Sequence, residues 1–506
     1  MPLAANATAP VPPPDSHTVK GALRAPAVLR REVVAGLVVA LALIPEAISF
    51  SIIAGVDPRL GLFASFTMAV TIAIVGGRPA MISAATGAVA LVVAPVARNY
   101  GVDYLLATVI LAGVLQMVLA AAGVTRMMRF VPRSVMVGFV NALAILIFLA
   151  QVPHLVGVPW LVYPMVALGI AIMVFLPRVT AAVPGPLVAI ALITGLVLLG
   201  GLSLPDVGDE GDLPDSLPAL LVPDVPFTLD TLQIILPYAL AMALVGLLES
   251  LLTAKLVDDI TDTGSDKTRE AWGQGIANTV TGFFGGLGGC AMIGQTMINV
   301  RASGARTRIS TFSAGVLLLV LVVGFGDLVA AIPMAALVAV MVMVSVGTFD
   351  WHSVAPSTLR RMPRSETSVM LLTVVVTVVT HNLAIGVVAG VLWAMALFAR
   401  RVAHLADVDR EVVEDADGST HALYTVTGEL FFATSNDLAG QFHFSHDPER
   451  VVVDLTASHV WDASTVAVLD GVGAKYARHG KTLEIRGLNA HSTHMHDRLS
   501  GRLAVE

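Results

Sequence analysis

Two carboxylates stand in stretches of sequence that are otherwise apolar. Glu46 lies in ALIPEAISFS, directly after a proline, and Glu249 lies in LVGLLESLLTAK. A carboxylate inside such a segment is costly to bury and is a candidate functional group, because burial favours its neutral, protonated form. Both glutamates are therefore candidates for binding and releasing a proton. The alternative is that each is a structural group held by backbone donors.

Small and neutral polar residues gather at the starts of two short apolar segments, where they could bind an anion. The candidate binding residues of these two segments, with Glu46, are Ser83, Ala85, Thr86, Gly87, Ile293, Gly294, Gln295 and Thr296. The first segment is Arg78 to Arg98, RPAMISAATGAVALVVAPVAR, and the second is Phe283 to Arg301, FFGGLGGCAMIGQTMINVR. The alternative is that these residues only pack helices together, which small polar residues often do in membranes.

The length of these two segments is what makes them notable. A membrane-spanning helix needs about 20 residues, whereas the second segment looks helical only over Cys290 to Val300. A helix of that length begins near the bilayer midplane and points unpaired N–H groups and the positive end of its dipole into the membrane interior. Such an end is tolerated only against protein or a water-filled cavity, and it favours anions. Paired interrupted segments of this kind indicate the central site of a transporter.

The composition predicts a membrane protein with many spans. The 506 residues are 56% hydrophobic and only 13% charged, against about 25% charged residues in globular chains. The proline-rich start, residues 1–23, has no apolar core of a signal peptide, so it is expected to be a cytoplasmic tail. The single cysteine, Cys290, excludes an intrachain disulfide and offers no basis for a thiolate metal site. We expect no cofactor, no nucleic-acid partner and no enzyme activity.

Fourteen apolar segments are predicted, in two repeats that cover about residues 24–202 and 231–402. The expected segments are 33–54, 60–76, 84–97, 103–122, 133–151, 160–176, 186–202, 231–254, 271–287, 290–300, 309–325, 328–348, 367–381 and 383–399. Glu46 and Glu249 are 203 residues apart, and Pro132 and Pro333 are 201 apart, which indicates a repeat of inverted topology. With the N-terminus inside, Lys and Arg fall mostly on the cytoplasmic side and the acidic loop 203–230 outside.

The last hundred residues change to a soluble pattern. Three stretches, YTVTGELFFATSNDL, VVVDLTASHVWDAS and TLEIRGL, alternate with helix-compatible pieces such as VAVLDGVGAKYARHG. This alternation predicts one small α/β domain over residues 403–506 with right-handed crossovers. The protein is thus expected in the cell (inner) membrane, with its N-terminus and this domain in the cytoplasm.

Several stretches resemble the sulfate permease (SulP) family of anion transporters. They are IPEAISFSIIAGVDPRLGLFAS, LLESLLTAKLVDDITDTGSDKTREAWGQGIANTVTGFFGG and NVRASGART. The resemblance covers about residues 24–500 and implies a 7+7 inverted-repeat fold like that of uracil permeases, with a core domain, a gate domain and a cytoplasmic STAS domain. It also implies that the substrate binds between the third and tenth segments, near acidic residues that match Glu46 and Glu249.

Two departures from the family pattern bear on function. Many members carry an arginine near the start of the tenth segment, where this chain has Gln295, and the phosphorylatable serine of the STAS loop is matched by Ala463, with Ser464 next to it. Without the fixed positive charge, entry of an anion together with a cation becomes the natural mechanism.

The sequence therefore predicts proton-coupled symport of a small carboxylate or dicarboxylate, of the fumarate type, by alternating access, with Glu46 or Glu249 as the proton site. Sulfate, bicarbonate or chloride transport or exchange and an anion channel stay open, as does a membrane-tethered STAS scaffold. The predicted partners are the anion, a coupling proton or sodium ion and the lipid bilayer, and a homodimer is left open.

Overall fold

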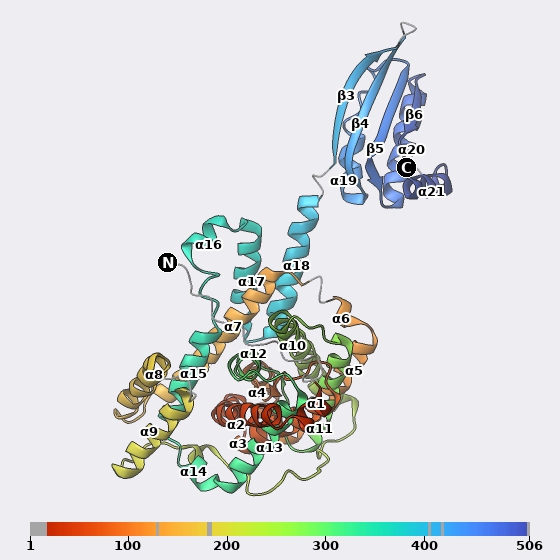
Figure 1. Ribbon diagram of the computed structural model, residues 1–506. Coiled ribbons are helices and arrows are strands. Elements are labelled where there is room, and N and C mark those ends of the chain that lie inside the picture. Colours follow the sequence, from red (N-terminus) through yellow and green to blue (C-terminus); the bar gives the residue numbers. More distant parts are fainter. Residues whose placement is uncertain (1–17, 128–130, 180–184, 403–405, 416–418, 503–506) are drawn as a thin grey trace. The chain divides into compact units, whose positions relative to one another are not determined.

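The computed structural model describes residues 18–127, 131–179, 185–402, 406–415 and 419–502 (Figure 1). The chain divides into two compact units, residues 1–391 and 392–506, which are described separately. Most of the predicted N-terminal tail and residues 403–405 lie outside the described part. The predicted domain boundary at residue 402 therefore stays a prediction.

The first unit is built almost entirely of helices. In the first half these are α1 (Val19–Arg24), α2 (Pro26–Ala54), α3 (Pro58–Val75), α4 (Gly87–Tyr100), α5 (Val102–Ala121), α6 (Val124–Met127), α7 (Arg133–Gln151), the 3₁₀ turn η3 (Val152–Leu155), α8 (Val162–Val179), α9 (Gly185–Leu199) and the 3₁₀ turn η4 (Val207–Glu210). In the second half they are α10 (Leu229–Thr261), α11 (Lys267–Phe283), α12 (Ile293–Met297), the π-helical turn η5 (Ile298–Ala302), α13 (Arg308–Gly324), α14 (Gly326–Ala330), α15 (Met334–Thr348), α16 (Pro356–Arg361), α17 (Arg364–Thr380) and α18 (Leu383–Val402), in which the division between the units falls.

The lengths of these helices agree with a membrane protein. Six helices of the described residues are at least 18 residues long and apolar enough to cross a membrane, and α2 and α10, of 29 and 33 residues, are the longest of them. Four shorter helices, α8, α9, α13 and α15, are also apolar. Each predicted segment overlaps a helix, but a total of fourteen crossings stays a prediction.

The helices of the first unit pack in two groups. In one group, the core bundle, α2 packs on α13, α3 on α11 and α13, and α5 on α10 and α11, while α4 and α12 pack on α2 and α10. In the other, the gate bundle, α7 packs on α15 and α17, and α8 packs on α9 and α15. In the predicted repeat, α2, α5, α7 and α8 of the first half correspond to α10, α13, α15 and α17 of the second. The pair α2 and α13 then corresponds to the pair α10 and α5, and the pair α7 and α17 corresponds to the pair α15 and α8. All four pairs pack together, so the packing repeats between the halves as the predicted repeat requires.

The second unit contains a four-stranded sheet with three helices, which agrees with the small α/β domain that the sequence predicted. The elements are β3 (Asp407–Glu414), β4 (Thr420–Leu430), α19 (Phe432–Ala439), β5 (Arg450–Val460), α20 (Ala463–Arg478), β6 (Thr482–Arg486) and α21 (Ala490–Leu499). The sheet order is β3-β4-β5-β6, with β3 antiparallel to β4 and the other pairs parallel (Figure 1). Residues 432–438, predicted as the end of a strand, are helical, because β4 ends at Leu430 and α19 forms the crossover to β5.

The buried carboxylate of Asp447 links two strands and one helix of this domain by hydrogen bonds. Asp447 accepts hydrogen bonds from the Arg410 guanidinium at 2.8 Å and from the Tyr424 and Tyr476 hydroxyls at 2.7 and 2.5 Å. Burial opposes ionisation of Asp447, but the hydrogen bonds from Tyr476, Tyr424 and Arg410 prevail and lower its pKa below the usual value. The ionised form of Asp447 therefore stabilises the folded domain.

Candidate anion site

Two short strands cross where the sequence placed the two interrupted segments. β1 (Ser83–Ala84) pairs antiparallel with β2 (Cys290–Ala291), so that Ser83 lies opposite Ala291 and Ala84 opposite Cys290. The predicted helix at 290–300 is therefore wrong at its start, since the helical turns run from Ile293 to Ala302. The first segment begins with the extended strand β1, and its helix α4 starts at Gly87. The reason is that each extended pair satisfies the other's backbone groups inside the protein.

A glycine makes this crossing possible. A Cβ atom on Gly289 would lie 2.0 Å from the Ala84 carbonyl oxygen, so only glycine fits where the two chains approach each other. Asn278 of α11 holds the same residue, with its Oδ1 accepting from the Gly289 N–H at 2.9 Å and its Nδ2 donating to the Gly289 carbonyl at 3.0 Å. Behind the crossing, the α4 helix begins with Thr86 as its N-cap, whose side chain accepts from the Val89 N–H at 3.3 Å.

A cavity of about 380 Å³ lies at the starts of α4 and α12. Its walls come from both bundles. The core bundle contributes Glu46, Phe50, Thr86, Gly87, Glu249, Leu252, Met292, Ile293 and Gly294, and the gate bundle contributes Phe139, Val140, Leu143, Ile147, Val344, Gly347 and Thr348. The structure thus brings six of the sequence-predicted site residues to one cavity, including both glutamates.

Glu249 is joined to the start of α4 through the cysteine. The Cys290 Sγ donates to Glu249 Oε2 at 3.0 Å and lies 3.1 Å from Thr86 Oγ1. All three side chains are buried, with exposed fractions of 8% for Glu249, 0% for Cys290 and 2% for Thr86. Ser250, next to Glu249 on α10, fixes β2 by accepting from the Ala291 N–H at 3.1 Å.

Glu46 also lines the cavity, and it lies in the part of α2 that contains Pro45. Its carboxylate lies beside the side-chain amide of Gln295 on α12. Gln295 is only 2% exposed, and its Oε1 has no hydrogen-bond partner among the described residues. Gln295 therefore contacts Glu46 but is not among the residues that line the cavity.

Three other predicted residues hold the crossing together and do not line the cavity. Ser83 Oγ accepts from Gln274 Nε2 at 2.8 Å, and Thr296 Oγ1 accepts from the Ile82 N–H at 3.0 Å. The Ala85 N–H donates to Ser65 Oγ at 3.3 Å. Any role of these residues in binding stays a prediction and would act through the shape of the crossing.

The sequence reasoning missed the gate side of the cavity and the part played by Cys290. Phe139, Leu143 and Ile147 lie four residues apart on α7, so they form one face of that helix, as the spacing itself could have indicated. Nothing in the sequence pairs that face with α4. In the structure, Gly87 lets α4 lie close to this face of α7, because a Cβ at Gly87 would lie 3.0 Å from Phe50 and 3.1 Å from Ile147.

The charge of the cavity is unusual for an anion site. Among the described residues, those that line it include two carboxylates and no Lys, Arg or His. The favourable groups for an anion are the Thr86 hydroxyl and the N-terminus of α4, which carries about half a positive charge. Each glutamate that is protonated therefore removes one of the two negative charges that an anion meets in this cavity.

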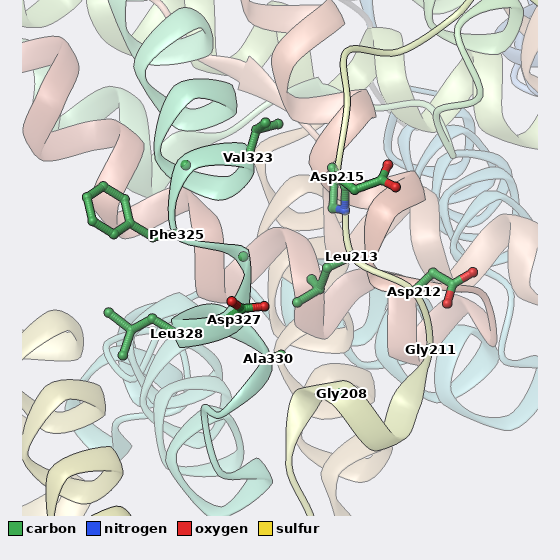
Figure 2. Close-up of a pocket in the computed structure, with 13 residues that line it drawn as sticks. Gly208, Gly211, Asp212, Leu213, Asp215, Val323, Phe325, Asp327, Leu328 and Ala330 are labelled. Carbon is green, nitrogen blue, oxygen red and sulfur yellow. The ribbon is translucent and has the colours of Figure 1, made fainter.

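A second cavity, of about 580 Å³, has a different character (Figure 2). It lies between the loop that contains Asp212 and Asp215 and the turn from α13 to α14, where Asp327 lies. Figure 2 shows these three carboxylates with the apolar side chains of Phe325 and Leu328. Its described lining residues include these three carboxylates and no basic side chain, so the cavity is acidic.

Comparison with known proteins identifies the family of this chain. The sulfate permease family model matches residues 29–165 and 159–373, and the STAS domain model matches residues 411–500. This chain belongs to the sulfate permease family. It therefore carries the STAS domain that the sequence resemblance implied, and the predicted family is confirmed.

Individual relatives of this family member are transporters. The putative sulfate transporter YbaR of Bacillus subtilis is 52% identical over 461 residues, which cover 91% of this chain and 95% of YbaR. The bicarbonate transporter BicA of Picosynechococcus is 26% identical over 483 residues, which cover 84% of this chain and 83% of BicA. The relatives are transporters rather than enzymes, as expected.

Solved structures show the same fold. The transmembrane domain of a cyanobacterial BicA matches with a TM-score of 0.63 and 27% identity, and the match covers 70% of this chain and 97% of that one. The murine anion transporter Slc26a9 in its inward-facing state matches with a TM-score of 0.78 over 93% of this chain and 87% of that one. At 14% identity this second match shows the fold alone, and it supports the polytopic helical fold with a C-terminal α/β domain.

Proposed function

We propose that this protein is a secondary anion transporter that binds a small anion in the cavity at the start of α4 and carries it with a proton. The observation that carries the proposal is the pairing of two glutamates with a helix N-terminus in one cavity whose described lining has no basic residue. Two ionised carboxylates would repel an anion there. Protonation of Glu46 or Glu249 removes one of the two negative charges and so weakens this repulsion.

The geometry also supports alternating access. The cavity is shared by the core bundle and the gate bundle, so movement of one bundle against the other would open it to either side. An inverted repeat allows each half to adopt the conformation of the other. The N-terminus and the STAS domain are proposed to lie in the cytoplasm, as the Lys and Arg distribution indicates.

Within this class, the chemistry of the cavity suits an anion whose charge is partly offset by the proton. A carboxylate or dicarboxylate is the substrate that the sequence predicted. The names of the relatives bring in sulfate and bicarbonate as the competing substrates, and sodium is the competing coupling ion. A scaffold without transport is not favoured by any feature of the cavity.

The test is uptake into proteoliposomes at zero membrane potential, with labelled fumarate, sulfate and bicarbonate, with and without an inward proton gradient. We expect the gradient to drive accumulation of one of these anions. Glu46→Gln or Glu249→Gln should remove most of the pH dependence, because glutamine stays neutral at every pH. Glu270→Gln is the matched control, since Glu270 is also buried but binds the backbone N–H groups of Gly77 and Arg78 away from the cavity.

Two results would contradict the proposal. One is accumulation that ignores the proton gradient and follows a sodium gradient instead. The other is a pair of glutamate variants that both keep the pH dependence of the wild type. Accumulation of sulfate or bicarbonate in preference to fumarate would keep the mechanism and replace the substrate.

A further inference from the structure

Thr86, Cys290 and Glu249 form a continuous hydrogen-bonded chain that starts and ends at the cavity. Thr86 and Glu249 both line the cavity, whereas Cys290 connects them from behind. Proton coupling as proposed above does not require such a connection. The chain is therefore a feature that the proposed function leaves unexplained.

The direction of the chain follows from the chemistry of its ends when Glu249 is ionised. An ionised carboxylate only accepts hydrogen bonds, so the Cys290 S–H must donate to Glu249. The only proton of the thiol is then engaged with Glu249, so the sulfur can only accept a hydrogen bond from the Thr86 hydroxyl. The Thr86 proton consequently points toward Cys290 and is withheld from the cavity, while Thr86 Oγ1 still accepts from the Val89 N–H.

Protonation of Glu249 allows the opposite direction. The new carboxylic O–H can donate to Cys290 Sγ, and the S–H can turn to donate to Thr86 Oγ1, which has lone pairs for both Cys290 and Val89. The Thr86 O–H is then free to point into the cavity. One proton enters at Glu249, no proton passes along the chain, and the only changes are rotations of one thiol and one hydroxyl.

We propose that Cys290 is a positioning residue that couples the protonation of Glu249 to the anion-binding donor at Thr86. The proposal rests on the proposed function and adds a second effect to it. Protonation removes a negative charge at Glu249, and through Cys290 it also presents a hydroxyl donor at the N-terminus of α4. Anion and proton thus favour each other's binding by more than their charges alone would give.

The surroundings contain few other groups that could intervene. Among the described residues, the titratable group bound to Glu249 is Cys290 of β2, and the other titratable group that lines the cavity is Glu46 of α2. Around Cys290 the neighbouring helices α5 and α11 present neutral amides, Gln116 beside Gly246 and Asn278 bound to Gly289. None of these amides changes charge with pH.

The first experiment compares Cys290→Ala with Cys290→Ser in proteoliposomes. The quantity measured is the ratio of the half-saturation constant for the transported anion at high pH to that at low pH. Cys290→Ala interrupts the chain and should reduce this ratio about tenfold, the effect expected for one hydrogen bond to a charged group. Cys290→Ser keeps a donor and an acceptor at the same place and should restore most of it.

The second experiment observes the thiol of Cys290 directly, first in the wild-type protein. Because Cys290 is the only cysteine of the chain, the S–H stretching band in the infrared spectrum reports one residue. We expect this band to shift to higher frequency on acidification, since the thiol exchanges a carboxylate acceptor for a neutral hydroxyl. In Glu249→Gln the band should no longer move with pH.

The outcomes separate the two proposals. If wild-type uptake does not depend on pH at all, the coupling in the proposed function fails. If uptake is pH-dependent and Glu249→Gln abolishes this dependence, but Cys290→Ala keeps the full ratio and the S–H band is unchanged by pH, then the proposed function holds and the relay is refuted. A Cys290→Ser variant no better than Cys290→Ala would likewise overturn the relay.

Discussion

The crossing of β1 and β2 should depend on the absence of a side chain at Gly289. In Gly289→Ala the new Cβ would lie 2.0 Å from the Ala84 carbonyl oxygen and 2.6 Å from its carbonyl carbon. The chains must separate by about 1.5 Å to reach ordinary contact. Both clashing atoms belong to the backbone, so no side-chain rotation can relieve the contact.

The loss of folding free energy in Gly289→Ala is the sum of two effects. Forcing a methyl group into a packed interior costs about 1–3 kcal/mol. Separation of the strands would also strain the two hydrogen bonds between Asn278 and Gly289, each worth about 1 kcal/mol. Together these effects destabilise the protein by about 3–5 kcal/mol. The same movement would displace Cys290 from Glu249 and Thr86.

The assay is thermal unfolding of the purified protein in detergent, followed by anion uptake in proteoliposomes. We expect Gly289→Ala to lower the melting temperature clearly and to lose uptake even in the fraction that is recovered folded. Gly294→Ala is the matched control, because a Cβ there meets no atom within 4 Å. It should keep the melting temperature, whatever its effect on uptake. A Gly289→Ala variant with wild-type stability and uptake would refute the account of the crossing.

Two further predictions concern the C-terminal domain and the topology. Because the pKa of Asp447 is lowered in the folded domain, its contribution to stability is complete above its pKa in the unfolded chain, about 4, and is lost as the pH falls through its pKa in the folded domain. Thermal unfolding of the isolated domain should show this loss of stability in acid. Asp447→Asn should be about 3 kcal/mol less stable at pH 7, and its stability should depend less on pH in the acid range. An equally steep acid loss in Asp447→Asn would assign it to other groups. In a Cys290→Ser background, an impermeant maleimide added to intact cells should label Glu210→Cys and should label Glu411→Cys only after lysis. The reverse pattern would invert the proposed orientation.

The sequence by itself determined the class of the protein and the neighbourhood of its site. Low charge and long apolar stretches can be stable only in a membrane, and a helix too short to span must begin inside it, which placed Thr86 and Ile293 at the centre. The cost of burying a carboxylate singled out Glu46 and Glu249. These conclusions rest on lengths and transfer energies, which are local properties of the chain.

Only the tertiary structure decided which side chains face the cavity. Ser83 and Thr296 look like ligands in the sequence, but each is taken up by a partner about 200 positions away, Gln274 and Ile82. Cys290 looked like a lone buried thiol until the antiparallel pairing of β1 and β2 set it between Glu249 and Thr86. Helical and strand periods fix which residues share a face, but the partner of that face depends on contacts between distant segments, and no local pattern encodes them.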